Sequence, residues 1–228
     1  MNGQRNPKKE SRVGKANRTK NIVLVGDLVA SRRIIERSAV QERLRDCLRQ
    51  LNSKKREGVV SPYTITLGDE FQAVFSAPDR LFRDAVTVLI ALYPVAVRFS
   101  FAIGEISTAI NTKQAIGMDG PAFHEARATV DRLKKTKSLF AIASPDGAGL
   151  TLINQSLALV SHAIAKWPLS RLEILRGLSE NRTVKQMARD LRVTDKAVYK
   201  SIDAGAIRTI VPLLEEIIAS LRQILEQR

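Results

Sequence analysis

Apolar and polar residues follow two rhythms along the first 145 residues, one typical of strands and one typical of helices. Short apolar runs such as NIVLVGD, bounded by glycine or another turn residue, predict buried strands. Stretches in which apolar residues recur every three or four positions predict amphipathic helices. The predicted elements are strands at 21–27, 59–67, 71–76, 95–106 and 139–144, and helices at 36–54, 78–94 and 121–137.

The order of these elements is β-α-β-β-α-β, followed by one more helix and strand. This is the order of a ferredoxin-like fold, in which helices cover one face of a mostly antiparallel sheet. In that topology the end of the first strand lies beside the turn of the central hairpin. Asp27 and Asp69 each follow a glycine at these two strand ends. We therefore expect an α+β domain over residues 21–145 in which the two aspartates lie close together.

Beyond the loop SPDGAGL (144–150), the pattern becomes wholly helical. Residues 146–228 are predicted to form an all-α region. It contains one long amphipathic segment, three short helical units with Thr183 and Thr194 as N-caps, and a last helix from about Arg208.

The short units, at about 166–210, have the rhythm of a bacterial helix-turn-helix. Ala188 and Ala197 are predicted to face inward, where their small size lets the two helices cross closely. Residues 169–209 hold nine basic and five acidic residues, a balance that suits phosphate contacts. The alternative is a helical bundle used only for oligomerisation. The candidate DNA-binding residues are Arg182, Lys185, Arg192, Thr194, Lys196, Tyr199 and Lys200.

The last helix places Leu214, Ile217, Leu221 and Ile224 at spacings of three and four residues. Such a seam is typical of a coiled coil and favours a homodimer, which would suit two half-sites on a DNA duplex. Packing of the same seam onto the upstream helices is the alternative.

Charge and composition favour a cytoplasmic protein with a polyanionic partner. The formal net charge is +14, of which +6 lies in residues 1–20, a basic tail predicted to be disordered. A solubilising surface is the plain alternative. No apolar run approaches the roughly 18 residues of a membrane helix, and the N-terminus does not resemble a secretory signal. The single cysteine, Cys47, lies among leucines and is expected to pack.

The paired carboxylates are candidate metal ligands. Mg²⁺ prefers hard oxygen ligands, and one or two carboxylates together with phosphate oxygens and water suffice to hold it. Asp27, Asp69 and Glu70 are therefore candidate ligands for Mg²⁺ and, through it, for a nucleotide. The alternative is that the aspartates serve as turn or cap residues and that Glu70 faces solvent.

Four motifs together resemble the SatD family: VGDLVASRR (25–33), TITLGDEFQAVF (64–75), FAIGEIST (101–108) and AIGMDGPAFHEAR (115–127). The N-terminal half also resembles, more distantly, class III nucleotidyl cyclases and GGDEF diguanylate cyclases. In those families an aspartate after the first strand and acidic residues at the hairpin hold the metals that carry a nucleoside triphosphate. The resemblance places Asp27, Asp69 and Glu70 at these positions. Arg127 fits the cyclase arginine, whereas Phe123 stands where the cyclases have asparagine.

These motifs predict a DNA-binding transcriptional regulator whose N-terminal domain binds a nucleotide or phosphate ligand through a divalent metal. The competing hypothesis is a nucleotidyl transferase, cyclase or phosphohydrolase that acts on nucleoside triphosphates. Each candidate ligand residue has a structural alternative, such as a strand end for Glu105 or a solvated helix face for His124 and Arg127. The candidate nucleotide- or phosphate-binding residues are Gly26, Ser31, Arg32, Gly68, Glu105, His124 and Arg127.

Overall fold

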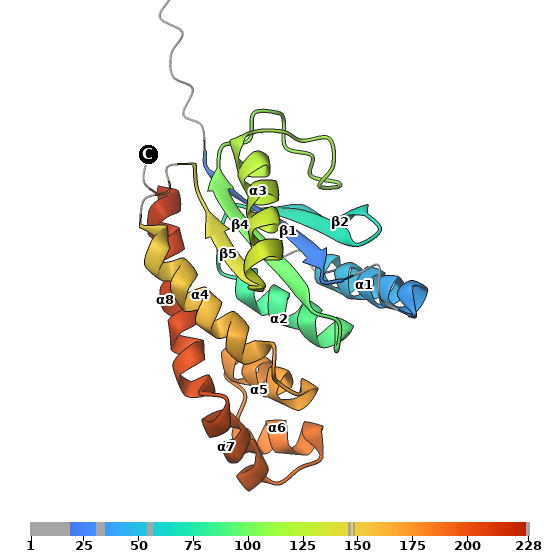
Figure 1. Cartoon of the computed structure of the whole chain (residues 1–228), viewed down its shortest axis with the longest axis vertical. Coiled ribbons are helices and arrows are strands. Elements are labelled where there is room, and N and C mark those ends of the chain that lie inside the picture. Colours follow the sequence, from blue (N-terminus) through green and yellow to red (C-terminus); the bar gives the residue numbers. More distant parts are fainter. Residues whose placement is uncertain (1–18, 31–34, 54–56, 146, 148, 227–228) are drawn as a thin grey trace, which may run out of the picture.

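The structure is a computed structural model that describes residues 19–30, 35–53, 57–145, 147 and 149–226. Most of the predicted basic tail (1–18) and the candidate ligand residues Ser31 and Arg32 lie outside these residues. The described chain is mixed α+β, as predicted, with a five-stranded sheet and a helical region after it (Figure 1).

The sheet has the strand order β2-β3-β1-β4-β5. The central strand β1 pairs antiparallel with both β3 and β4, and β5 pairs parallel with β4. The strands are β1 (Asn21–Leu28), β2 (Val59–Leu67), β3 (Glu70–Phe75), β4 (Val97–Gly104) and β5 (Phe140–Ala143).

Helices cover both faces of the sheet. The helices of this part are α1 (Arg37–Asn52), α2 (Leu81–Leu92) and α3 (Pro121–Thr136). Alternate residues of β1 face opposite sides, so Ile22 and Leu24 pack in the core formed with α1 and α2, whereas Val23 and Val25 pack under α3. α3 crosses the sheet face seen in Figure 1. α3 therefore also covers the end of the sheet at which Asp27 lies.

After the sheet, the described part of the chain forms five further helices. They are α4 (Leu150–Ile164), α5 (Leu169–Ser179), α6 (Val184–Leu191), α7 (Asp195–Ala204) and α8 (Ile207–Glu226). α5 packs against α2, and α8 runs back along the helical part (Figure 1). Buried apolar residues of α5, α6, α7 and α8 belong to the same core cluster as those of β1, α1 and α2. The sheet and the helical region therefore share one core.

The apolar seam of α8 is used inside the chain. Leu214, Ile217 and Leu221 are all buried, with at most 6% of their surface exposed. Their burial corresponds to the alternative in which the seam packs onto upstream helices. The seam therefore gives no support to a homodimer, which stays a prediction without an assigned surface.

No helix among the described residues is long and apolar enough to cross a bilayer.

Candidate functional site

The ends of β1 and of the β2–β3 hairpin lie side by side. Asp27 on β1 is directly opposite Glu70 on β3 and Arg98 on β4. The backbone amide of Leu28 donates a hydrogen bond to the carbonyl of Asp69 at 3.0 Å. The structure thus gathers all three predicted metal ligands at one end of the sheet.

Two cationic side chains hold the carboxylate of Asp27. Arg98 Nη1 lies 3.0 Å from Oδ2, and Lys134 Nζ from α3 lies 3.5 Å from Oδ1. The pair with Arg98 is largely buried, since only 13% of the Arg98 side chain and 11% of the Asp27 side chain are exposed. A buried carboxylate needs such partners, because an unpaired charge away from water is costly.

These contacts do not fit a divalent cation as they stand. Both carboxylate oxygens of Asp27 face positive groups, and the Glu70 carboxylate accepts a hydrogen bond from Thr66 Oγ1 at 3.0 Å. Among the described residues, no group of three or more acidic, histidine or cysteine side chains is placed to hold a metal. Mg²⁺ binding at Asp27, Asp69 and Glu70 would require the ion pairs to open, and it stays a prediction.

A cavity of about 520 Å³ lies beside this cluster, between the β2–β3 hairpin, the segment 116–118 and α3. Arg127 and Lys134 of α3 contribute positive charge to it, and Glu70 and Asp131 contribute negative charge. Lys134 connects the cavity to the cluster, because its ammonium group also pairs with Asp27. The lining residues are Thr66, Leu67, Glu70, Gln72, Ile116, Gly117, Met118, Arg127, Val130, Asp131 and Lys134.

Gln72 is the buried polar group of this cavity. Its side-chain amide nitrogen donates to the carbonyl of Ala115, while its oxygen, Oε1, has no hydrogen-bond partner among the described residues. The residue is 4% exposed. Buried polar atoms are nearly always hydrogen-bonded, so this buried amide oxygen next to the cavity lacks, within the described part of the chain, a donor that most such atoms have.

Of the other predicted ligand residues that the structure describes, Arg127 alone lines this cavity. His124 lies one turn earlier on α3, where its Nε2 is 3.1 Å from Asp119 Oδ1 at the exposed start of the helix. Glu105 follows β4 at the opposite end of the sheet. Six residues of β1 separate that end from Asp27, which corresponds to roughly 20 Å.

The two candidate glycines have structural explanations. Gly26 is opposite Phe71 on β3, and the Phe71 ring occupies the space that a Cβ atom at Gly26 would need. Gly26 therefore lies on the sheet face away from Asp27. Gly68 forms the hairpin turn, where its carbonyl accepts a hydrogen bond from Gln41 Nε2 at 2.8 Å.

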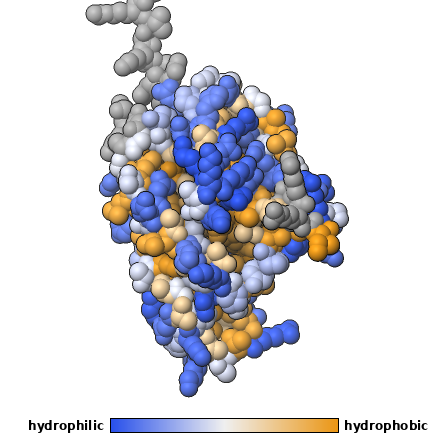
Figure 2. Space-filling model, viewed as in Figure 1, coloured by the Kyte–Doolittle hydropathy of each residue, from blue (hydrophilic) through white to orange (hydrophobic). Residues whose placement is uncertain are grey.

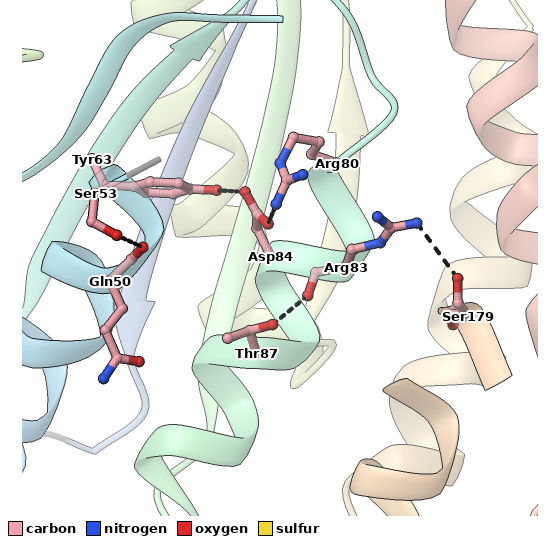
Figure 3. A network of polar contacts seen from close by, with 8 residues as sticks. All are labelled: Gln50, Ser53, Tyr63, Arg80, Arg83, Asp84, Thr87 and Ser179. Atoms are coloured by element: carbon pink, nitrogen blue, oxygen red, sulfur yellow. Dashed lines mark hydrogen bonds and ion pairs between the residues drawn. The ribbon is translucent and has the colours of Figure 1, made fainter. Parts of the chain in front are cut away.

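A larger cleft, of about 1030 Å³, lies between the sheet domain and the helical region, lined by residues of α2, α5 and α8. Its wall contains a buried polar network (Figure 3). Asp84 Oδ1 pairs with Arg80 Nη2 at 2.8 Å, and Asp84 Oδ2 accepts a hydrogen bond from the Tyr63 hydroxyl at 3.1 Å. Arg83 reaches from α2 to the carbonyl of Ser179 on α5, at 3.5 Å. The network thus ties α2 to the hairpin and to the helical region.

Burial controls the acid–base properties near this network. It raises the pKa of the Tyr63 hydroxyl well above its ordinary value, and the negative charge of Asp84 adds to the effect. The pKa of the Cys47 thiol is raised to about 11, mainly by burial and then by Asp84. Cys47 is therefore a thiol rather than a thiolate at neutral pH, in agreement with the expectation that it packs.

The segment from α5 to α7 holds the predicted DNA-binding residues. α6 and α7 are joined by three residues, of which Arg192 has a left-handed backbone conformation. Both predicted N-caps are confirmed: Thr183 Oγ1 accepts a hydrogen bond from the Gln186 amide, and Thr194 Oγ1 accepts one from the Ala197 amide. These caps fix where each short helix begins.

Most of the candidate DNA-binding side chains face solvent. Arg182 is the exception, since it is half-buried and pairs with Asp190. Hydrophilic residues project at the lower end of the molecule, where α6 and α7 lie (Figure 2). The exposed candidates are Lys185, Arg192, Thr194, Lys196, Tyr199 and Lys200.

One prediction for this segment was wrong. Ala197 is exposed, whereas Val198 and Ile202 are buried. Ala188, the other alanine predicted to face inward, is buried as expected. A second close contact joins a different helix pair, because a Cβ atom on Gly177 of α5 would meet the Met187 side chain of α6.

The comparisons with known proteins identify the family. A model of the SatD family matches residues 21–212. The chain belongs to the SatD family. The SatD match includes the whole sheet, α4 to α7 and the first residues of α8, so both the cavity and the α6–α7 segment lie within it. No curated protein sequence matches the chain.

Proposed function

We propose that this SatD family protein is a DNA-binding regulator that contacts duplex DNA through α6 and α7. The observation that carries the proposal is the pair of short, capped helices whose outer surface is exposed and basic. Residues 182–208 contain seven basic and three acidic residues, a balance that favours a polyanion. A three-residue turn between the helices is typical of a helix-turn-helix.

Within this proposal α7 acts as the recognition helix. Its first turn begins at the Thr194 cap, and Lys196, Tyr199 and Lys200 are exposed on it. In a helix-turn-helix, residues of this kind near the N-terminus of the second helix reach base edges and phosphates. Lysines at these positions would bind phosphates, and Tyr199 would contact a base or a sugar.

The N-terminal part is the ligand-responsive part in this proposal. The strand order, with β1 between two antiparallel neighbours, supports the ferredoxin-like arrangement that cyclase-like domains use. The proposed ligand is a nucleotide or related phosphate, and the cluster around Asp27 together with its cavity is the place for it. α2 of the sheet domain packs against α5 beside the cleft. In this proposal, a shift of α2 would move α5 and, with it, the DNA-binding helices.

Fluorescence anisotropy with a labelled pool of duplexes tests DNA binding. We expect the logarithm of the binding constant to fall linearly with the logarithm of the salt concentration. Lys196→Ala with Lys200→Ala should lower affinity and reduce the slope by about two, one for each lost phosphate contact.

The matched control is Arg45→Ala with Arg49→Ala, which removes two exposed positive charges from α1. It should leave the slope unchanged. The proposal fails if no duplex binds at low salt, or if the two double variants weaken binding equally.

A further inference from the structure

We infer that the cavity between the hairpin and α3 binds a nucleoside monophosphate directly, without a bridging metal ion. This inference rests on the ligand-binding half of the proposed function and is independent of DNA binding. It differs from the prediction based on the carboxylates, in which Mg²⁺ on Asp27, Asp69 and Glu70 holds the phosphates. The structure gives three requirements that an occupant has to meet.

The first requirement is a hydrogen-bond donor. Gln72 is buried in the wall of the cavity, and its Oε1 has no partner among the described residues. The Glu70 carboxylate lines the same cavity and is an acceptor as well. Oε1 itself is buried, so an occupant with N–H or O–H groups on the side that faces β3 would match Glu70 directly and Gln72 after a turn of its amide toward the cavity. The edge of a nucleobase carries such groups.

The second requirement is an anionic group of limited charge. Arg127 and Lys134 line the α3 side, where both can donate to phosphate oxygens. Glu70 and Asp131 balance these two positive charges. A triphosphate would bring several negative charges to a cavity whose own charges cancel, and repulsion from the carboxylates would oppose it. A single phosphate adds less negative charge than a triphosphate and can still accept hydrogen bonds from Arg127 and Lys134.

The third requirement is an apolar middle. Leu67 and Ile116 line the cavity although they are 65% and 41% exposed, so they lie at its mouth. Met118 and Val130 add further apolar surface. A flat ring that packs against these side chains would remove their apolar surface from water. The volume, about 520 Å³, is within the range of pockets that bind small molecules.

The test is a thermal-shift and calorimetric titration of the full chain in buffer that contains EDTA. The probes are AMP, GMP, CMP and UMP, with ribose 5-phosphate and inorganic phosphate as probes that lack a base. At least one of the four nucleotides should raise Tm by mass action, and the probes without a base should bind more weakly.

Variants separate this cavity from other sites. Arg127→Ala removes an exposed cation of the cavity and should weaken nucleotide binding about tenfold or more. Lys135→Ala is the matched control, because Lys135 is an exposed cation on α3 that does not line the cavity. Leu67→Ser should weaken nucleotide binding roughly fivefold. Binding of ribose 5-phosphate should not change, since only the base loses apolar contact. Leu67 is exposed, so this variant is expected to fold.

Three results would overturn the inference. One is that none of the four nucleotides shifts Tm in EDTA, as would be seen if water alone satisfied Gln72. Another is that the Arg127→Ala variant and the parent bind the nucleotide with equal affinity. The third is binding that requires Mg²⁺, which would mean that the ligand is held through a metal on Asp27, Asp69 and Glu70. Because none of these measurements uses DNA, a failure here is distinguishable from a failure of DNA binding.

Discussion

The buried pair between Arg80 and Asp84 allows a quantitative prediction. Asp84 lies on α2 with 2% of its side chain exposed, and it contacts Arg80 Nη2 and the Tyr63 hydroxyl. Arg80→Met keeps much of the side-chain volume and removes the cation. The carboxylate then stays buried after losing the cation 2.8 Å away, which is the costly way to break a buried ion pair.

The expected magnitude follows from burial. Removing one partner of a fully buried pair costs about 3–5 kcal/mol. The Arg80 side chain keeps 21% of its surface exposed, so water partly screens the pair and we expect the lower end, about 3 kcal/mol. For a protein of this size, such a loss lowers Tm by roughly 6–12 °C.

Urea unfolding followed by circular dichroism measures the free energy of unfolding. Arg83→Met is the matched control, because Arg83 lies on the same helix but is exposed, with one long contact to the Ser179 carbonyl. It should change stability by less than about 1 kcal/mol. The double variant Arg80→Met with Asp84→Asn should recover much of the loss, since it removes the buried charge while the amide oxygen can still accept the hydrogen bond from the Tyr63 hydroxyl.

Either of two outcomes would contradict a costly buried charge at Asp84. In one, Arg80→Met is no more destabilising than Arg83→Met. In the other, the double variant is as unstable as Arg80→Met alone. Either result would show that the charge on Asp84 is not what makes Arg80 important.

Two further predictions concern packing and pH. Gly26→Ala should lower the free energy of unfolding by about 1–3 kcal/mol in the same urea assay, because the added Cβ would overlap the buried Phe71 ring; an unchanged midpoint would contradict this. Since the pKa of Cys47 is raised to about 11 in the folded protein, its contribution to stability is complete below about pH 9 and is lost as pH rises through 11. We expect a decrease of up to about 3 kcal/mol over this range, and a Cys47→Ala variant with the same pH dependence would argue against the assignment.

The local pattern of the sequence predicted most elements and several of their ends. The threonine caps at Thr183 and Thr194 were predictable because an N-cap acts on residues two or three positions away. Apolar spacing likewise predicted α1 and α3 to within two residues of their observed ends. The start of α2 was placed at Pro78 instead of Leu81, since a proline near a helix start does not fix the first helical residue.

The partners of Asp27 were not predictable in the same way. Arg98 lies 71 positions away in the sequence and Lys134 more than one hundred, and only the strand register and the docking of α3 bring them together. One signal was present. Arg98 and Ser100 are polar residues at alternate positions of an otherwise apolar strand, as Gln72 is in β3, and this indicates a polar patch on one sheet face.

The seam of α8 shows a different limit. Spacings of three and four residues place Leu214, Ile217 and Leu221 on one face, but the same spacing serves a partner helix or the chain's own core. The structure places these residues in the core. Periodicity therefore predicted which face is buried, and not what buries it.

The buried residues of α5 to α8 and those of α1 and α2 form one core. The helical part is therefore not an independent domain that could be exchanged. An autonomous DNA-binding domain has its own hydrophobic core and can be joined to new partners by a linker. Here the last helix adds apolar side chains to a core that begins at Ile22. Recombination that joined this helical part to a different sheet would leave the packed faces of α2 and α5 open to water. The two parts are therefore expected to be inherited, and to diverge, together.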